Sequence, residues 1–400
     1  MGDAKGGSWV RTAAVLAAVA VAARVALYKA TEVVIPEHLL GKPAVYVPQL
    51  FGNETQRALL DLLVERGEIP SNSADTSFYK TLHEHIGEAQ PIEADGTCSH
   101  PYLMPNQDRT LCILPGRIDI ARAFALTGGF NGIKENLSGL FSRLLSFGIY
   151  LFNDDVENNE VIRSLFNSPE FVKAAKQVCP PNKQHLDPFQ FNFIVQIPSQ
   201  TVPTHLDGVY FKGATRFEYP QWLLAVMKSS GVFEDRFVDQ VQVVGYLSDW
   251  DREATARTPS KFGEFIFWDK NGDRAGRRMP PLPRSGNAID GSKVIHTTSI
   301  YRPDALAKYS LQDLRISIVY RGRCFRDQDE ATAFRDNIGN AETAMKLDDI
   351  LEKLVSHGKA LASKAPPPLE HRLDLAMWLL DTYIAYPYPD LADVWMPFNF

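Results

Sequence analysis

The sequence predicts an α+β protein in which an all-β sandwich or barrel is flanked by helical regions on both sides. From about residue 189 to 325, short strand-like runs alternate with turns rich in Gly and Pro. This pattern is typical of a sandwich or barrel rather than of alternating strand–helix–strand units. Helical periodicity precedes this part of the chain and returns after it. A chain of 400 residues with 45% hydrophobic content can bury a substantial core.

The strand candidates are short runs bounded by turn residues. Phe189–Ile197 alternates bulky and polar side chains, which is the period of two expected of a strand with two different faces. The other candidates are 241–247, 265–268, 287–295 and 314–320. Further upstream, residues 43–51 predict a strand that leads into a turn. Asn53 then caps a helix, with Gln56 three positions later, as in a capping box.

Helices and loops are expected in the remaining parts. Helical periodicity covers 137–151 and 160–178, whereas 71–116 is polar and predicts a long loop region. In the C-terminal part, Pro366–Pro368 separates two helices. We therefore divide the chain into an N-terminal signal anchor or targeting segment, a helical and loop region, the β core and a C-terminal helical region, with bounds 1–30, 31–188, 189–325 and 326–400.

The N-terminal segment predicts attachment to a membrane. Residues 13–23 are apolar and largely alanine, with Lys5 and Arg11 before them and Arg24 after them. A spanning helix needs about 20 apolar residues, so a short anchor requires Arg24 to extend to the interface. We expect a single-pass anchor in the endoplasmic reticulum, with the positive flank in the cytosol. A cleaved signal peptide, an organellar transit peptide and a soluble helix are the alternatives.

The charge and the cysteine content argue against several classes of protein. The net charge of −6 arises from interspersed acids and bases, and nucleic-acid binding would need a concentrated basic face. The four cysteines, Cys98, Cys112, Cys179 and Cys324, are too scattered for a disulfide scaffold or a zinc knuckle. Cys98 and Cys112 could pair in a lumen, but ordinary thiols are the expectation.

The segment Thr204–Gly208 contains the sequence His-x-Asp. Because side chains two apart in extended chain point to the same side, His205 and Asp207 can meet a single ion. A third ligand must come from elsewhere, and His296 stands where a strand is expected to end. Two His and one carboxylate leave open coordination positions, as in the iron(II) oxygenases without haem.

The same short pattern occurs a second time, at His185 and Asp187. The surrounding sequence distinguishes the two copies. His205 follows a predicted strand and precedes a strand-rich region, whereas His185 follows a polar segment at the edge of the helical region. We therefore expect His185 to be a surface loop residue and His205 to be the ligand.

An ordered set of landmarks surrounds these residues. One predicted strand ends in Tyr246–Leu247, and a strand of the form Gly-Glu-hydrophobic follows at Gly263–Phe267. The turn that leads to His296 comprises Pro283–Gly286 and Ala288–Gly291, and the last strand is Leu314–Tyr320. Together with the entrance at 43–51, this order resembles the 2-oxoglutarate-dependent dioxygenases, most closely the prolyl-4-hydroxylase-like branch. The resemblance covers about 43–65 and 189–323.

The resemblance implies a double-stranded β-helix, or jelly roll, flanked by N- and C-terminal helices. It also implies that His205, Asp207 and His296 are the catalytic metal ligands for Fe(II). The reaction would consume molecular oxygen and 2-oxoglutarate as cosubstrates, with ascorbate as reductant, and release succinate and carbon dioxide. Because Asp207 leaves no room for a halide, hydroxylation or a related oxidation is favoured over halogenation.

The residues that bind the cosubstrate depart from the prolyl-4-hydroxylase pattern. Many members of that branch use Lys for the distal carboxylate of 2-oxoglutarate, whereas this strand has Arg315. Arg315 and Ser317 share a strand face, and a guanidinium with a hydroxyl suits a carboxylate. The long spacer 297–314 leaves Arg321 as an alternative to Arg315.

Several functions are compatible with the sequence. We favour oxidation of a small, lipophilic metabolite at a membrane over a prolyl-4-hydroxylase-like protein hydroxylase acting on peptide substrates. A β-sandwich binding module without catalysis is an alternative from another class, and a metal-dependent cupin-type isomerase or hydrolase is a further one. No nucleic acid is expected as a partner.

Overall fold

The computed structural model describes residues 33–65, 90–91, 93–94, 104–105, 111–113, 147–152, 158–196, 202, 204–215, 219, 221–299, 301, 314–338, 340 and 342–384. In these ranges, no helix is both long enough and apolar enough to cross a membrane. The N-terminal segment 1–30 lies outside them, so the anchor stays a prediction.

The largest sheet is antiparallel throughout and has six strands in the order β1-β10-β7-β12-β6-β5. These strands are β1 (Ala44–Val47), β5 (Phe147–Phe152), β6 (His185–Gln196), β7 (Gln240–Tyr246), β10 (Gly286–Ile289) and β12 (Arg315–Phe325). The predicted strand at 43–51 is thus present as β1, at one edge of this sheet. The strand predicted from Phe189 begins earlier, at His185.

A second antiparallel sheet has the order β11-β8-β9, formed by His296–Thr298, Phe265–Phe267 and Arg277–Met279. An isolated bridge between His205 and His296 adds the His-x-Asp segment to its edge. From β6 onward the chain alternates between the two sheets except at the consecutive pair β8 and β9, and this path is that of a double-stranded β-helix. The expected jelly-roll core is therefore confirmed. A third small sheet joins β2 (Gln90–Pro91), β4 (Leu111–Ile113) and β3 (Met104–Pro105).

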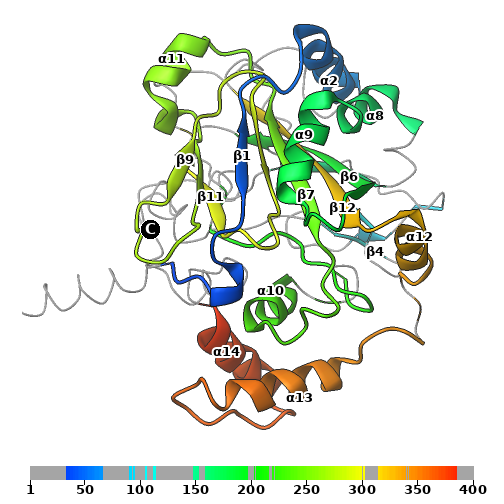
Figure 1. Cartoon of the computed structure of the whole chain (residues 1–400), viewed down its shortest axis with the longest axis vertical. Helices are drawn as coiled ribbons and strands as arrows, with labels where there is room; N and C mark the ends of the chain where they lie inside the picture. Colours follow the sequence, from blue (N-terminus) through cyan, green and yellow to red (C-terminus); the bar gives the residue numbers. More distant parts are fainter. Residues whose placement is uncertain are drawn as a thin grey trace, which may run out of the picture.

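Helices cover the outer face of the large sheet. Helices α2 (Asn53–Glu65), α8 (Glu160–Phe166) and α9 (Pro169–Val178) lie together on this side in Figure 1. Tyr320 of β12 packs against the rings of Phe166 and Phe171, with centroid distances of 5.1 and 5.0 Å. The outward side chains of β6, β7 and β12 thus belong to one apolar cluster with these helices.

The prediction of helices was right in one stretch and wrong in part of another. Residues 160–178 are helical, but Ser168 and Pro169 start a new helix in the middle of the run. Residues 147–151, expected to be helical, belong to strand β5, which pairs with β6. A short apolar run fits either structure, and the available partner strand decides.

The C-terminal helices form a second layer around α10 (Gln221–Ser230). Helices α13 (Leu347–Gly358) and α14 (Arg372–Tyr383) pack with α10 below the barrel in Figure 1, and Pro366–Pro368 lies in their connection as expected. The remaining helices are α11 (Arg252–Arg257), α12 (Gln328–Asp336), η1 (Glu37–Leu39) and η2 (Pro259–Lys261).

The inner face of the large sheet is unusually polar for a buried surface. Side chains alternate along each strand, so the residues between the apolar outward ones point toward the second sheet. They include Gln190, Asn192 and Gln196 of β6, Gln240 and Gln242 of β7, Asn287 of β10, and Arg315, Ser317 and Arg321 of β12, all of them buried. Because buried polar groups are costly unless bonded, this face suits a polar ligand better than an apolar filling.

Cys179 and Cys324 form a disulfide, with Cα atoms 5.8 Å apart. No pairing of Cys179 with Cys324 was expected from the sequence. The two residues are 145 positions apart in sequence, and only the packing of α9 against the large sheet brings them together. The side chains of Cys98 and Cys112 are outside the described part of the chain.

The second His-x-Asp copy has a structural role. Asp187 is fully buried and forms ion pairs with Arg323, at 2.7 Å, and with Arg335. His185 begins strand β6 and is half-buried, rather than lying on a surface loop. With both carboxylate oxygens held by guanidinium groups, Asp187 is not available to a metal, in agreement with the choice of the other copy.

Replacing Asp187 tests this role. Asp187→Ala leaves the buried Arg323 without one of its charged partners, and loss of one member of a buried pair costs about 3–5 kcal/mol. We expect the free energy of unfolding in urea to fall by about this amount. His185→Ala is the matched control and should change stability little. Metal binding that disappears in His185→Ala while stability is unchanged would contradict this assignment.

Candidate metal centre

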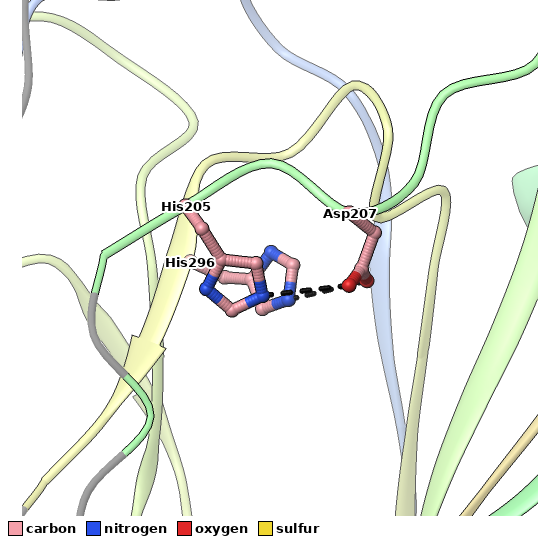
Figure 2. A group of neighbouring side chains, drawn as sticks. All are labelled: His205, Asp207 and His296. Carbon is pink, nitrogen blue, oxygen red and sulfur yellow. Dashed lines mark ion pairs between the residues drawn. The ribbon is translucent and has the colours of Figure 1, made fainter. Parts of the chain in front are cut away.

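Three side chains converge inside the barrel, at the edge of the second sheet. Figure 2 shows His205 and His296 side by side, with the carboxylate of Asp207 facing both rings. Each imidazole places its Nε2 atom 3.4 Å from a different oxygen of Asp207. All three candidate ligand atoms lie within 4.8 Å of one another, and all three residues are buried. The structure therefore brings together the three ligands expected from the sequence.

Backbone hydrogen bonds hold this geometry. His205 and His296 exchange both of their backbone N–H···O=C bonds, at 2.9 and 3.0 Å, so their side chains leave adjacent strands at the same level. Two residues later, the N–H of Asp207 donates to the carbonyl of Gly291 at 2.8 Å. The spacing of two in His-x-Asp then directs the carboxylate toward the same side as the imidazole.

The ring of His296 is oriented by its own strand. Its Nδ1 atom lies 2.7 Å from the carbonyl oxygen of Val294. Because a carbonyl only accepts, Nδ1 must carry the proton in this contact, and Nε2 presents its lone pair to the site. A hydrogen bond of this kind on the remote nitrogen is typical of metal-binding histidines.

Asp207 is charged despite its burial. Burial alone would raise its pKa, but the positive charge of Arg321, the nearby His296 and the contacts with both imidazoles lower it, with a net result well below the usual value. The Nη2 atom of Arg321 lies 2.9 Å from Oδ1 of Asp207. A buried carboxylate that keeps its charge is a good ligand for a divalent cation.

The loop after β10 supports Asp207 from behind. Asp290 accepts hydrogen bonds from the backbone of Gln240 and Ser292, both at 3.1 Å, and so fixes the turn that contains Gly291. Lys293 is paired with Asp290 at 3.2 Å and with Asp239. The acidic neighbours raise the pKa of Lys293 against the opposing effect of burial, which keeps this loop anchored by a charged lysine.

Gly291 lies so close to Asp207, one of the candidate metal ligands, that there is no room for a side chain at this position. A Cβ atom built on it would lie 2.1 Å from Oδ2 of Asp207 and 2.6 Å from Nε2 of Gln242. The glycine is therefore required by the close approach of the backbone to the carboxylate rather than by its own conformation.

Arg315 and Ser317 lie at the other end of the inner face of β12. The guanidinium of Arg315 donates to the carbonyls of Phe262 and Gly263 at 3.2 and 3.0 Å, to Gln196, and to Ser317 at 3.4 Å. None of these partners is charged, and among the described residues no carboxylate pairs with Arg315. A fully buried guanidinium without a counter-charge is a strong candidate to bind an anion.

Gly263 makes room for this guanidinium. It has a φ of +77°, and a Cβ atom there would lie 2.5 Å from Nε of Arg315. The ring of Tyr246 lies under the guanidinium, with its centroid 5.3 Å away. Burial raises the pKa of Tyr246, so its hydroxyl stays neutral and accepts a hydrogen bond from Asn287 at 2.9 Å.

Several residues of the site could not be identified as site residues from the sequence alone. The inner-face amides Gln196, Gln242 and Asn287 give no signal beyond their alternation with apolar residues along predicted strands. Arg321 was considered only as an alternative anion-binding residue, and the structure places it on Asp207 instead of beside Arg315. Gly263 and Gly291 lay within the landmarks, but their close contacts could not be anticipated.

No protein-family model matches the chain, and no curated protein matches it either. Among solved structures, it is similar to a viral collagen prolyl hydroxylase from Paramecium Bursaria Chlorella virus-1, in complex with 2-oxoglutarate, with 10% identity and a TM-score of 0.33, over 71% of this chain and 97% of that chain. It is similar to HygX from Streptomyces hygroscopicus, with nickel and 2-oxoglutarate bound, with 8% identity and a TM-score of 0.32, over 71% and 82%. It is also similar to the α-ketoglutarate-dependent epimerase SnoN from nogalamycin biosynthesis, with 10% identity and a TM-score of 0.31, over 71% and 78%.

The contact of Gly291 with Asp207 can be tested directly. Gly291→Ala forces the carboxylate away from the imidazoles, and displacement of the groups that orient a ligand weakens metal binding by about 10- to 100-fold. We expect this loss in calorimetric titrations with Zn(II) or Mn(II), with the folded state retained. Gly52→Ala is the control, because a Cβ atom there meets nothing within 4 Å. Unchanged metal affinity in Gly291→Ala would contradict the geometry of the site.

Proposed function

We propose that this chain is an Fe(II)- and 2-oxoglutarate-dependent oxygenase. The observation that carries the proposal is the buried convergence of His205, Asp207 and His296 in the same barrel as Arg315, a buried guanidinium without a counter-charge. Two imidazole nitrogens and one carboxylate oxygen suit iron and similar transition metals better than Mg²⁺ or Ca²⁺, which prefer oxygen ligands alone. Three protein ligands leave coordination positions for a cosubstrate and for oxygen.

Arg315 and Ser317 are proposed to bind the distal carboxylate of 2-oxoglutarate. A guanidinium suits a carboxylate in charge and shape, and on binding Arg315 would exchange its neutral contacts with Gln196 and Ser317 for charge-assisted hydrogen bonds. Carbonyl groups of Phe262 and Gly263 hold the guanidinium in place before any ligand arrives. Such preorganisation lowers the cost of ordering on binding.

The protein contributes positioning and a low-dielectric site to the reaction. Nδ1 of His296 keeps its proton and donates it in a hydrogen bond to the carbonyl of Val294, which leaves Nε2 for the metal. Arg321 holds Oδ1 of Asp207, so that Oδ2 faces His296. Burial of all three ligands excludes water from the centre. When bound, the iron supplies the oxidation chemistry that couples decarboxylation of 2-oxoglutarate to oxidation of the substrate.

The proposal extends to the class of substrate and to the cellular compartment. We favour a small metabolite as substrate, and the polar inner face supports one with hydrogen-bonding groups at the reacting end, whatever lipophilic part it carries. A prolyl-4-hydroxylase-like activity on peptides is the second candidate. The disulfide between Cys179 and Cys324 supports maturation in an oxidising compartment, as the predicted membrane anchor in the endoplasmic reticulum would require.

The metal ligands are tested by turnover. With iron, 2-oxoglutarate and ascorbate, the wild-type protein should release succinate when lipid, pigment or peptide pools are supplied. His205→Ala, Asp207→Ala and His296→Ala should each abolish this release, because each removes one of only three protein ligands. His185→Ala is the matched control and should remain active. Succinate release that survives loss of His205 but not of His185 would refute the assignment, and a wild-type protein that binds neither iron nor 2-oxoglutarate would favour a non-catalytic binding module.

The cosubstrate site is tested by affinity for 2-oxoglutarate. Arg315→Ala should weaken binding by about 3–5 kcal/mol, because the carboxylate is then buried without a counter-charge. Arg315→Lys keeps the charge but loses the fork, so its effect should be intermediate. Ser317→Ala removes one neutral donor and should cost about 1 kcal/mol.

The glycine beside Arg315 provides an independent test of the same site. Gly263→Ala should weaken 2-oxoglutarate binding while leaving Zn(II) affinity intact, since its Cβ atom would meet the guanidinium and not the metal ligands. Gly272→Ala is the matched control, because Gly272 has a similar positive φ of +81° but open space around it. Equal effects of the two variants would mean that backbone strain, rather than contact with Arg315, causes the loss.

A further inference from the structure

Arg321 is a second buried arginine on the inner face of β12, and only one of its nitrogens contacts Asp207. It lies on β12 six positions after Arg315, on the same inner face, and is 6% exposed. Its Nη2 atom is 2.9 Å from Oδ1 of Asp207. Its Nε and Nη1 atoms are buried and have no hydrogen-bond partner among the described residues.

Unused donors on a buried guanidinium point to a ligand. A guanidinium has five N–H donors in a planar fork, and Nη2 lies between the two other nitrogens. Asp207 can use only one of the two hydrogens on Nη2, so a fork of two parallel donors remains open on the opposite side. A carboxylate is the group that matches such a fork, and leaving these donors buried without an acceptor is costly.

The neighbours of Arg321 do not fill this need. Gln190 and Gln242 are its cross-strand partners in the register of the sheet. Gln190 donates to Asn192 at 2.9 Å, and its own carbonyl oxygen has no partner among the described residues. The open fork of Arg321 therefore lies beside polar, uncharged side chains, and among the described residues Asp207 is the one carboxylate that pairs with Arg321.

The balance of charge favours a further anion. Asp207 supplies one negative charge, whereas Arg315, Arg321 and a divalent metal supply four positive charges. The two carboxylates of 2-oxoglutarate leave one positive charge in a buried site of low dielectric, where uncompensated charge is expensive. A substrate with one carboxylate would neutralise it.

We propose that Arg321 binds a carboxylate inside the barrel, beside the metal centre and separate from the site at Arg315, and that the primary substrate is a carboxylate-bearing small molecule. This inference rests on the proposed function. The carboxylate has two possible sources, the primary substrate and the 1-carboxylate of 2-oxoglutarate itself, and the charge balance favours the substrate.

The experiment uses the full chain loaded with Zn(II), which supports binding without turnover. Calorimetry measures the affinity for 2-oxoglutarate in the wild type, Arg321→Gln and Arg321→Lys. ¹⁹F NMR then measures binding of 4-fluorobenzoate to the complex saturated with 2-oxoglutarate, with the neutral 4-fluorobenzamide as the matched probe. Arg278→Gln removes the same charge from a surface arginine paired with Glu264 and is the control variant.

If the substrate is the source, the wild-type complex binds 4-fluorobenzoate at least about tenfold more tightly than the amide, and Arg321→Gln removes this preference. If the cosubstrate is the source, Arg321→Gln weakens 2-oxoglutarate binding by about tenfold or more, and the probe does not bind the saturated complex. Arg321→Lys keeps a charge beside Asp207 and so retains zinc; it should be intermediate in either case.

The proposal is overturned if Arg321→Lys and Arg321→Gln change neither the 2-oxoglutarate affinity nor the preference for the carboxylate probe. Arg321 would then only neutralise Asp207. Failure of the proposed function has a different signature, because the wild-type protein itself would not bind 2-oxoglutarate.

Discussion

The pair of backbone hydrogen bonds between His205 and His296 is the interaction on which the rest of the site depends. It attaches the His-x-Asp segment to the edge of the second sheet and sets both imidazoles at one level. The next contact along the segment, from Asp207 to Gly291, then brings the carboxylate opposite the rings. Without this register, the three ligands would belong to separate parts of the barrel, since 91 positions of sequence separate His205 from His296.

The barrel is built so that its apolar side faces outward toward helices and its polar side faces inward. On β12, Ile316, Ile318 and Tyr320 pack under α8 and α9, whereas Arg315, Ser317 and Arg321 face the second sheet. The core that stabilises the large sheet is therefore outside the barrel, and the interior is left for binding. Strand β12 can therefore bury Arg315 and Arg321 on its inner face while its outward side chains join the apolar core.

The supporting residues act on different parts of the site. Asp290 and Lys293 fix the turn that brings Gly291 against Asp207, whereas Gly263 and two backbone carbonyls hold Arg315. The two ends of the inner face of β12 therefore have separate supports.

The class of fold and the candidate metal ligands could be predicted from the sequence, because both follow from local patterns. Alternation along Phe189–Ile197 and later runs requires strands, and the spacing of two in His205-x-Asp207 places two ligands on one side of an extended chain. The ion pair of Arg321 with Asp207, the disulfide between Cys179 and Cys324 and the strand at 147–152 are visible only in the tertiary structure. In each of these cases the deciding partner is remote in sequence, and such contacts follow from packing and register, which no local pattern contains.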